Sequence, residues 1–299
     1  MRRYLWIALV LGACAANPPA AVAPASSAAQ PSGDGPAALT SPTAAERAAL
    51  RREGLAAYEQ QAWATCADLL ARAGDWYDAA CCRARGGELD LAFALLERVM
   101  ADGFRDVAHL DRDPDLASLR ADPRWSTAVA AASANHQAYL ATVEPELLAL
   151  YQADQADRAR PYDQIDWKTV GPRDAERRRR VDELVAAGRA RVADDYYHAA
   201  MVYQHGENVA EIRRARELAL AAVKLEDGHA RARWLAAAAL DRELMYQDQP
   251  QKYGTQYKRL DGRWVLWKVD PSTTDAERAA WGVPSLAEAE AQATAMNAR

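Results

Sequence analysis

The residues that could carry out a reaction gather in the second half of the chain. Gln204 and His205 end one predicted helix, and Asp241 and Arg242 lie near the end of a later one. If the two helices meet, His205 could act as a general base that Asp241 orients, as in a hydrolase. His205 also precedes Gly206, where a histidine ring can instead bind the last carbonyls of its own helix. Catalysis and helix capping are therefore both open for this residue.

A short polar segment follows these helices. Its polar and conformationally special residues are Gln251, Tyr253, Gly254, Thr255 and Gln256. β-Forming residues flank an Asp261-Gly262 turn pair, which predicts a β-hairpin near residues 252–269. Gly254 inside a strand indicates a bulge or close backbone approach. Because glutamine amides both donate and accept hydrogen bonds, the segment predicts either a structural fastening or a ligand-recognition surface.

These residues together resemble a bacterial family of unknown function. The shared marks are a Gln-His pair, an Asp-Arg pair and a Gln-x-Tyr-Gly-Thr-Gln hairpin, and the resemblance covers roughly residues 140–295. The chain departs from the pattern at Asp248, where glycine is common, and at Lys268, where the strand often ends in proline. The family has no settled activity, so the resemblance implies candidate site residues and no reaction.

Metal and cofactor sites find little support. His198 and His205 are separated by about 10.5 Å of helix rise, too far to share one metal ion comfortably. Asp194 and His198, one helical turn apart, are more typical of a local hydrogen bond than of a ligand pair. The adjacent Cys81 and Cys82 lack the spacing of a zinc or redox pair. We expect no metal and no cofactor.

The charge distribution argues against a nucleic-acid partner. The chain has 37 Lys and Arg residues against 42 Asp and Glu residues, a formal net charge of -5. The basic run 177–180 is interspersed with acidic residues on a predicted helix, which indicates a solvated face with salt bridges. A protein or peptide partner is expected, and a small-molecule ligand stays unknown.

The N-terminus resembles a bacterial lipoprotein signal. Arg2 and Arg3 precede an apolar segment too short to span a membrane, and Leu-Gly-Ala-Cys at residues 11–14 resembles the lipobox. The resemblance implies a signal peptide over residues 1–13 and acylation, including palmitate, of Cys14; an ordinary secretory signal is the alternative. Alanines after the cysteine imply the outer membrane, facing the periplasm. Anchoring would be through lipid, and several acyl chains make it durable.

The elements that position these residues are predicted to be helical. Residues 14–42 form an Ala/Pro/Ser-rich tether. Residues 43–133 alternate helices with small crossing residues such as Gly54, and they resemble tetratricopeptide repeats. The remaining elements lie in a domain over residues 134–299: a connecting helix at 134–151, a polar loop at 160–174, helices near 173–187, 191–205, 209–225 and 229–246, and the hairpin. The predicted fold class is mainly α, with tetratricopeptide-like helical hairpins followed by a helical domain that carries one C-terminal β-hairpin.

Two cysteines of the first domain are candidates for a disulfide. Cys66 and Cys82 lie at similar distances on either side of the Gly74-Asp75 turn, so antiparallel helices would bring them to the same height. Cys81 points about 100° away from Cys82, so only one of the two suits Cys66, and we favour Cys82. Free cysteines buried at a helix crossing are the alternative.

Two functions follow from these features. Repeat grooves bind peptides or helices and carry out no reaction, which favours a lipid-anchored periplasmic binding or scaffolding protein. The rival is a hydrolase-like enzyme that uses His205, Asp241, Arg242 and the 251–256 segment. Convergence of these side chains on an open cleft would favour the enzyme, whereas burial and mutual bonding would count against it.

Overall fold

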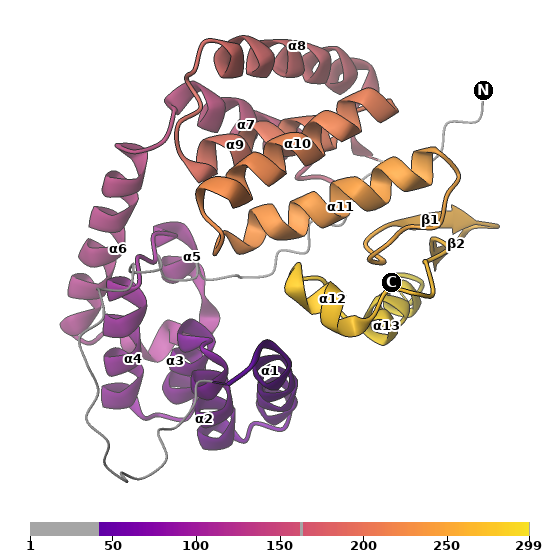
Figure 1. Ribbon diagram of the computed structural model, residues 1–299. Coiled ribbons are helices and arrows are strands. Elements are labelled where there is room, and N and C mark those ends of the chain that lie inside the picture. Colours follow the sequence, from indigo (N-terminus) through magenta and orange to yellow (C-terminus); the bar gives the residue numbers. More distant parts are fainter. Residues whose placement is uncertain (1–41, 162–163, 299) are drawn as a thin grey trace, which may run out of the picture. The chain divides into compact units, whose positions relative to one another are not determined.

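A computed structural model describes residues 42–161 and 164–298, and its chain divides between Tyr139 and Leu140 into two compact units. The described residues are mainly helical, which confirms the predicted fold class (Figure 1). The elements up to this boundary are α1 (Ala44–Glu59), α2 (Trp63–Ala73), α3 (Trp76–Arg85), α4 (Leu89–Ala101), α5 (Val107–Arg112), the 3₁₀ helix η1 (Pro114–Leu119) and α6 (Arg124–Leu140).

The N-terminal unit is built from successive helices that pack on their neighbours. α1 packs on α2, α2 on α3 and α3 on α4, and η1 closes against α3. Gly54 lets α1 approach α2, because a Cβ atom there would lie 2.7 Å from the Leu70 side chain. Phe93, Leu96 and Leu110 are buried in the second core of this unit. Gly54, the small residue noted in the sequence, is therefore a position where two helices make contact.

The cysteines divide between two faces of α3. Cys66 of α2 and Cys82 of α3 form a disulfide with their Cα atoms 6.0 Å apart. They share a core with Leu70, whereas the buried free Cys81 belongs to the neighbouring core with Phe93. The angle of about 100° between successive helical residues accounts for this division.

The C-terminal unit packs a helical core against one small sheet. Its elements are α7 (Pro145–Asp157), α8 (Trp167–Ala186), α9 (Ala193–Gln204), α10 (Val209–Leu225), α11 (Ala230–Tyr246), β1 (Tyr257–Leu260), β2 (Arg263–Leu266), α12 (Asp275–Ala280) and α13 (Leu286–Met296). α10 packs on both α9 and α11, and α9 also contacts α7 and α8. Buried alanines such as Ala199, Ala215 and Ala236 let these helices lie close together.

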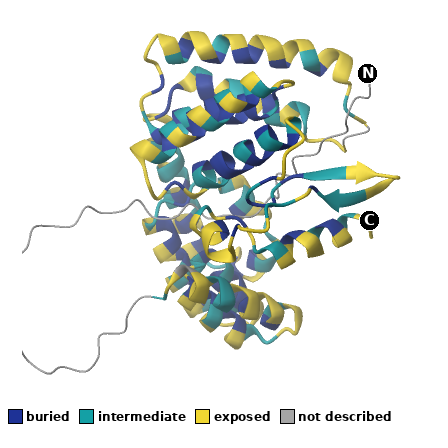
Figure 2. Ribbon diagram, turned by 45° about the vertical axis from the view of Figure 1, so that its right-hand side comes forward, coloured by how far each residue is buried: buried dark blue, intermediate teal, exposed yellow. Residues whose placement is uncertain are grey.

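The hairpin is shorter than the sequence predicts. β1 and β2 are antiparallel, with Tyr257 opposite Leu266 and Leu260 opposite Arg263. Asp261 and Gly262 have φ angles of 48° and 83°, as a two-residue hairpin turn requires. The segment 251–256 precedes the strands and forms a loop of its own. Figure 2 shows the two strands half-buried near their base and exposed at the turn.

Several predicted helix boundaries are wrong. The connecting helix predicted at 134–151 is divided between α6 and α7, because the chain turns before Pro145. α8 begins inside the predicted polar loop, where the Asp166 side chain caps the helix. The basic run at its centre is only half solvated, since Arg177 and Arg178 are buried. Within the described ranges, no helix has the length and apolarity needed to cross a membrane.

Candidate functional site

Asp241 is the centre of the polar segment. It lies on α11 and is fully buried. Its Oδ1 accepts the backbone N–H groups of Lys252 and Tyr253, each at 2.8 Å. Its Oδ2 accepts the N–H and the hydroxyl of Thr255 at 3.0 and 2.8 Å. Burial raises the pKa of Asp241, and these four donors oppose the rise by stabilising the carboxylate. One side chain thus fixes the path of the loop.

Gln251 connects this loop to the hairpin. The buried side chain accepts the Gln256 N–H at 2.8 Å and donates to the Gln256 carbonyl at 3.0 Å. The same Nε2 also donates to the Trp267 carbonyl at 3.0 Å. Gln256 in turn donates to the Ala238 carbonyl of α11 at 3.3 Å. The Gln251 amide therefore satisfies backbone groups at the start of the sheet, and the Gln256 amide joins the loop to α11.

Tyr253 and Gly254 complete the loop. Gly254 has a φ of 92°, a backbone conformation that residues with a side chain rarely adopt. The Tyr253 ring is buried, with its centroid 6.0 Å from that of Trp281. Its carbonyl accepts a 2.9 Å hydrogen bond from Arg278, which is itself buried. The loop is thereby held from α11 and from α12.

His205 has a different partner from the one the sequence suggests. Its Nδ1 lies 2.9 Å from Oδ2 of Asp154, a fully buried residue of α7. The predicted pairing with Asp241 is wrong, because both oxygens of that carboxylate are bonded to the loop. Burial lowers the pKa of His205, and the carboxylate of Asp154 opposes this effect. The ring is fixed by a distant helix rather than by the carbonyls of its own.

Gln204 and Arg242 are buried beside these groups. The Oε1 atom of Gln204 has no hydrogen-bond partner among the described residues. The positive charge of Arg242 lowers the pKa of His205, which places the guanidinium in the surroundings of that ring. Arg242 also lies over Tyr246, 6.0 Å from the ring centroid. α11 consequently carries Asp241 toward the loop and Arg242 toward the histidine.

Sequence reasoning misses the ion pairs that surround His205. Arg158 donates to Asp154 at 2.8 Å and also pairs with Asp174 of α8. Arg177 joins Asp174 at 2.8 Å and pairs with Asp157. The sequence signals only the local pairs, Asp154 with Arg158 and Asp174 with Arg177, which lie one helical turn apart.

His198 and Asp194 form no common ligand pair. The His198 ring stacks on Tyr151 with centroids 4.9 Å apart. Asp194 accepts instead from Nε2 of His229 at 3.1 Å, while Nδ1 of that histidine accepts the Ala232 N–H. Both nitrogens of His229 are thus used within the fold. Among the described residues, the cysteine and carboxylate atoms best placed for a metal belong to Cys81, Asp113 and Asp115 of the other unit.

Comparison of the chain with protein-family models, curated proteins and solved structures finds no match. The chain's own residues are therefore the basis for assigning a function.

Proposed function

We propose that this chain is a lipid-anchored periplasmic protein that binds or scaffolds another protein or a peptide through its N-terminal helical unit. The observation that carries the proposal is the use of the polar motif within the fold. Asp241 accepts four hydrogen bonds from one loop, and Gln251 satisfies three backbone groups. Their polar atoms fasten segments of the chain together, so recognition is assigned to another surface.

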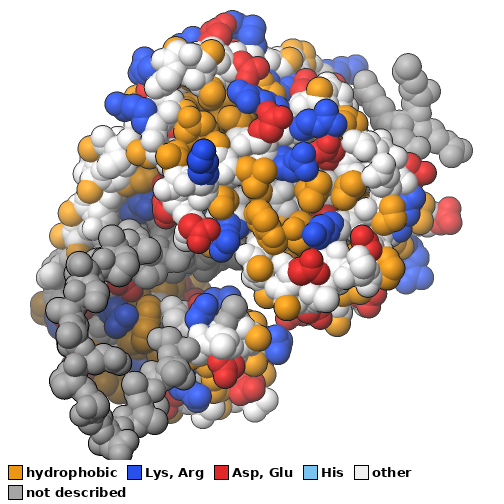
Figure 3. Space-filling view, in the orientation of Figure 1, with side chains coloured by type: hydrophobic (Ala, Val, Ile, Leu, Met, Phe, Trp, Pro, Cys, Tyr) orange, Lys and Arg blue, Asp and Glu red, His pale blue; other side chains and the backbone are white. Residues whose placement is uncertain are grey.

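The N-terminal unit offers helices suited to recognition. Leu55 of α1 and Leu91 of α4 are large apolar side chains that expose 49% and 50% of their surface. Stacked helical pairs of this kind commonly bind peptides or helices along their exposed faces. Lys and Arg are intermixed with Asp and Glu on the face shown in Figure 3, which suits a protein partner better than a nucleic acid.

The anchor is the second part of the proposal. Cys14 lies outside the described residues, and its lipobox-like setting supports acylation. Attachment by lipid would hold the protein at the outer membrane, facing the periplasm.

Site-specific photo-crosslinking in cell envelopes tests the binding proposal. A photoreactive residue at Leu55 or Leu91 of the full chain should yield an adduct with the same partner. Leu225, which is 56% exposed on α10, is the matched control position and should yield no such adduct. The variants Leu55→Asp and Leu91→Asp should reduce capture, whereas Leu225→Asp should not. Equal adducts from all three positions, or none from the N-terminal unit, would contradict the proposal.

A hydrolase-like enzyme is the second candidate, in which Asp154 rather than Asp241 would orient His205. The observation that favours it is the His205–Asp154 pair, since a buried carboxylate can orient a histidine base. Hydrolysis of chromogenic esters should then fall by at least about 100-fold in His205→Gln. His136→Gln is the control. A turnover that survives His205→Gln would exclude this candidate.

A further inference from the structure

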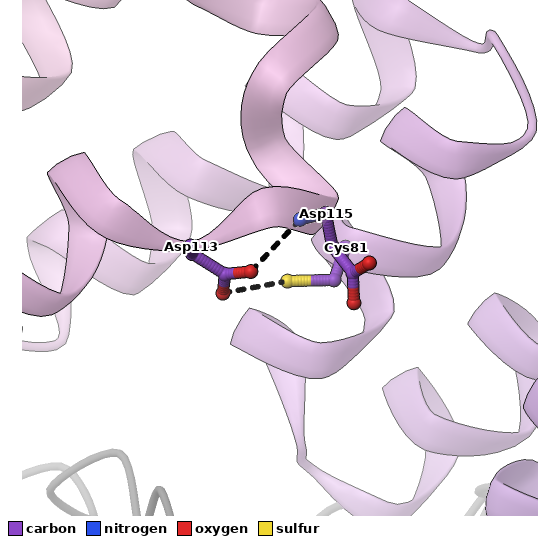
Figure 4. Close-up of side chains that lie close together, drawn as sticks. All are labelled: Cys81, Asp113 and Asp115. Atoms are coloured by element: carbon purple, nitrogen blue, oxygen red, sulfur yellow. Dashed lines mark hydrogen bonds between the residues drawn. The ribbon is translucent and has the colours of Figure 1, made fainter.

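A mixed group of metal-ligating side chains gathers in the N-terminal unit. Cys81 comes from α3, Asp113 precedes η1, and Asp115 lies in its first turn. One ligand atom from each lies within 4.8 Å of the others. Figure 4 shows the thiol of Cys81 and the carboxylate of Asp113 pointing toward one another, with Sγ 3.6 Å from Oδ2.

His109 adds a fourth donor from α5. Its Nε2 lies 3.6 Å from the same Oδ2 of Asp113. This nitrogen is buried and has no hydrogen-bond partner among the described residues. The His109 side chain is 32% exposed, so its unpaired nitrogen is free to turn toward the thiol and the carboxylates and to serve as a further ligand.

The spacing of these atoms suits a tetrahedral ion. With bonds of about 2.3 Å to sulfur and about 2.0 Å to nitrogen or oxygen, a tetrahedral site has edges of about 3.5 Å between S and O and about 3.3 Å between N and O. The two observed separations from Asp113 Oδ2, both 3.6 Å, lie close to these values. The ring of His109 lies outside the 4.8 Å grouping of Cys81, Asp113 and Asp115, so it would have to turn toward them to complete the site.

The surrounding groups already orient the carboxylates. Tyr77 donates its hydroxyl to Oδ2 of Asp113 at 2.9 Å, and Tyr58 donates to Oδ2 of Asp115 at 2.8 Å. Such hydrogen bonds from outside the ligand set fix the ligands and tune metal affinity. Nε of Arg85 lies 3.7 Å from Oδ1 of Asp115, so this carboxylate already faces a positive charge.

We propose that Cys81, His109, Asp113 and Asp115 bind one divalent cation of the zinc class. The mixture of sulfur, nitrogen and oxygen ligands suits Zn²⁺, whereas Ca²⁺ and Mg²⁺ favour oxygen alone. Binding replaces the thiol proton: Cys81–SH and Zn²⁺ give a zinc–thiolate bond and one released proton, with no change in oxidation state. The ion would join α3, α5 and η1, which close this unit.

The alternative is a purely structural cap. Oδ1 of Asp113 accepts the Asp115 N–H at 2.9 Å, as expected at a helix N-terminus. That role uses Oδ1, whereas Oδ2 accepts from Tyr77 and Cys81 and faces His109. Zinc titration separates the two accounts, because a cap alone predicts no stoichiometric binding.

The test uses the full chain, freed of metal with a chelator, without reductant so that the disulfide stays closed. Zn²⁺ is titrated against a chromophoric competitor, and Co²⁺ replaces it for spectroscopy. The wild type should bind one ion and show a thiolate-to-cobalt charge-transfer band. Asp111 is an exposed acid on α5, the helix that carries His109. The variants Asp111→Asn and His136→Asn are controls and should bind zinc as the wild type does.

Cys81→Ser and His109→Asn should weaken zinc binding by at least about 100-fold, since even changes outside the ligand set cost 10–100-fold. Far-UV circular dichroism of the metal-free variants checks folding. If Cys81→Ser unfolds, the zinc affinity of His109→Asn decides between the two accounts, because His109 is partly exposed and its replacement should leave the fold intact. Absence of stoichiometric zinc in the wild type, or unchanged affinity in a folded His109→Asn, would overturn the proposal. Neither result depends on partner capture.

Discussion

Single polar side chains hold together segments that the backbone alone would not connect. The carboxylate of Asp241 collects four donors from a loop that would otherwise leave its N–H groups unsatisfied beneath α12. A glutamate would place its oxygens one methylene too far, and an asparagine would direct an amide at two donors. The residue type follows from this geometry, and no reaction is needed to explain it.

His198 gives the C-terminal unit a pH dependence of known sign. Burial lowers its pKa from about 6.5 to about 4, so the unfolded chain binds the proton first as the pH falls. Stability from this residue is complete above pH 6.5 and is lost between about pH 6.5 and 4. From pH 7 to pH 5 the loss should be roughly 2 kcal/mol.

His198→Phe keeps an aromatic ring beside Tyr151 and removes the titration. Urea unfolding of both proteins at pH 7 and pH 5 measures the difference, which cancels the contributions of all other groups. The wild type should lose roughly 2 kcal/mol more than the variant over this range. Identical pH dependence in the two proteins would show that His198 does not titrate as described.

At the scale of the elements, the Cys66–Cys82 disulfide constrains the helical pair α2 and α3. It closes a loop with a sequence separation of 16. A loop of this size stabilises a fold by about 3 kcal/mol through the entropy of the unfolded chain. Cys66→Ala/Cys82→Ala should therefore lower the free energy of unfolding by about 3 kcal/mol. Added reductant should destabilise the wild type and leave the variant unaffected; equal sensitivity would contradict this.

Gly54 sets the distance between α1 and α2. An added Cβ would meet Leu70 Cγ at 2.7 Å and Cδ2 at 2.8 Å, and Leu70 is buried. Gly54→Ala should destabilise the unit by about 1–2 kcal/mol, because overpacking outweighs the better helix propensity of alanine. Gly228→Ala, where a Cβ would meet no atom within 4 Å, is the control and should change little. Thermal unfolding measures both, and a stabilised Gly54→Ala would refute the close approach.

Local patterns predicted helices well and the polar loop poorly. The period of apolar residues marks α10 and α11 to within one residue, since each buries one face. Tyr253 and Thr255 have strand propensity, yet both lie in a loop because Asp241 binds their N–H groups. A hydrogen bond from another helix outweighs intrinsic preference here. Propensity alone cannot contain that information.

At the scale of the whole molecule, the candidate residues were visible in the sequence but their partners were not. His205 pairs with Asp154, 51 residues earlier, and no local spacing marks that contact. Cys81 meets Asp113 across 32 residues for the same reason. Adjacent cysteines gave no metal signal, because the grouping depends on how α3 packs against η1. Tertiary packing creates both clusters.

The proposed lipid anchor at Cys14 would determine where the whole molecule acts. Metabolic labelling with a fatty-acid analogue should label the wild type through Cys14 and fail to label Cys14→Ser. Continued labelling of Cys14→Ser, or an unlabelled wild type, would refute the anchor.

If Asp241 and the 251–256 loop hold the C-terminal unit together, the substitution Asp241→Asn should lower the free energy of unfolding. The variant should lose about 2–4 kcal/mol in urea unfolding, because two of the four donors would face an amide NH₂ group in place of an acceptor. Asp248→Asn, whose side chain is 84% exposed, is the matched control and should change stability by less than about 0.5 kcal/mol. If Asp241→Asn is as stable as the wild type, the carboxylate is not a structural fastening and the claim is wrong.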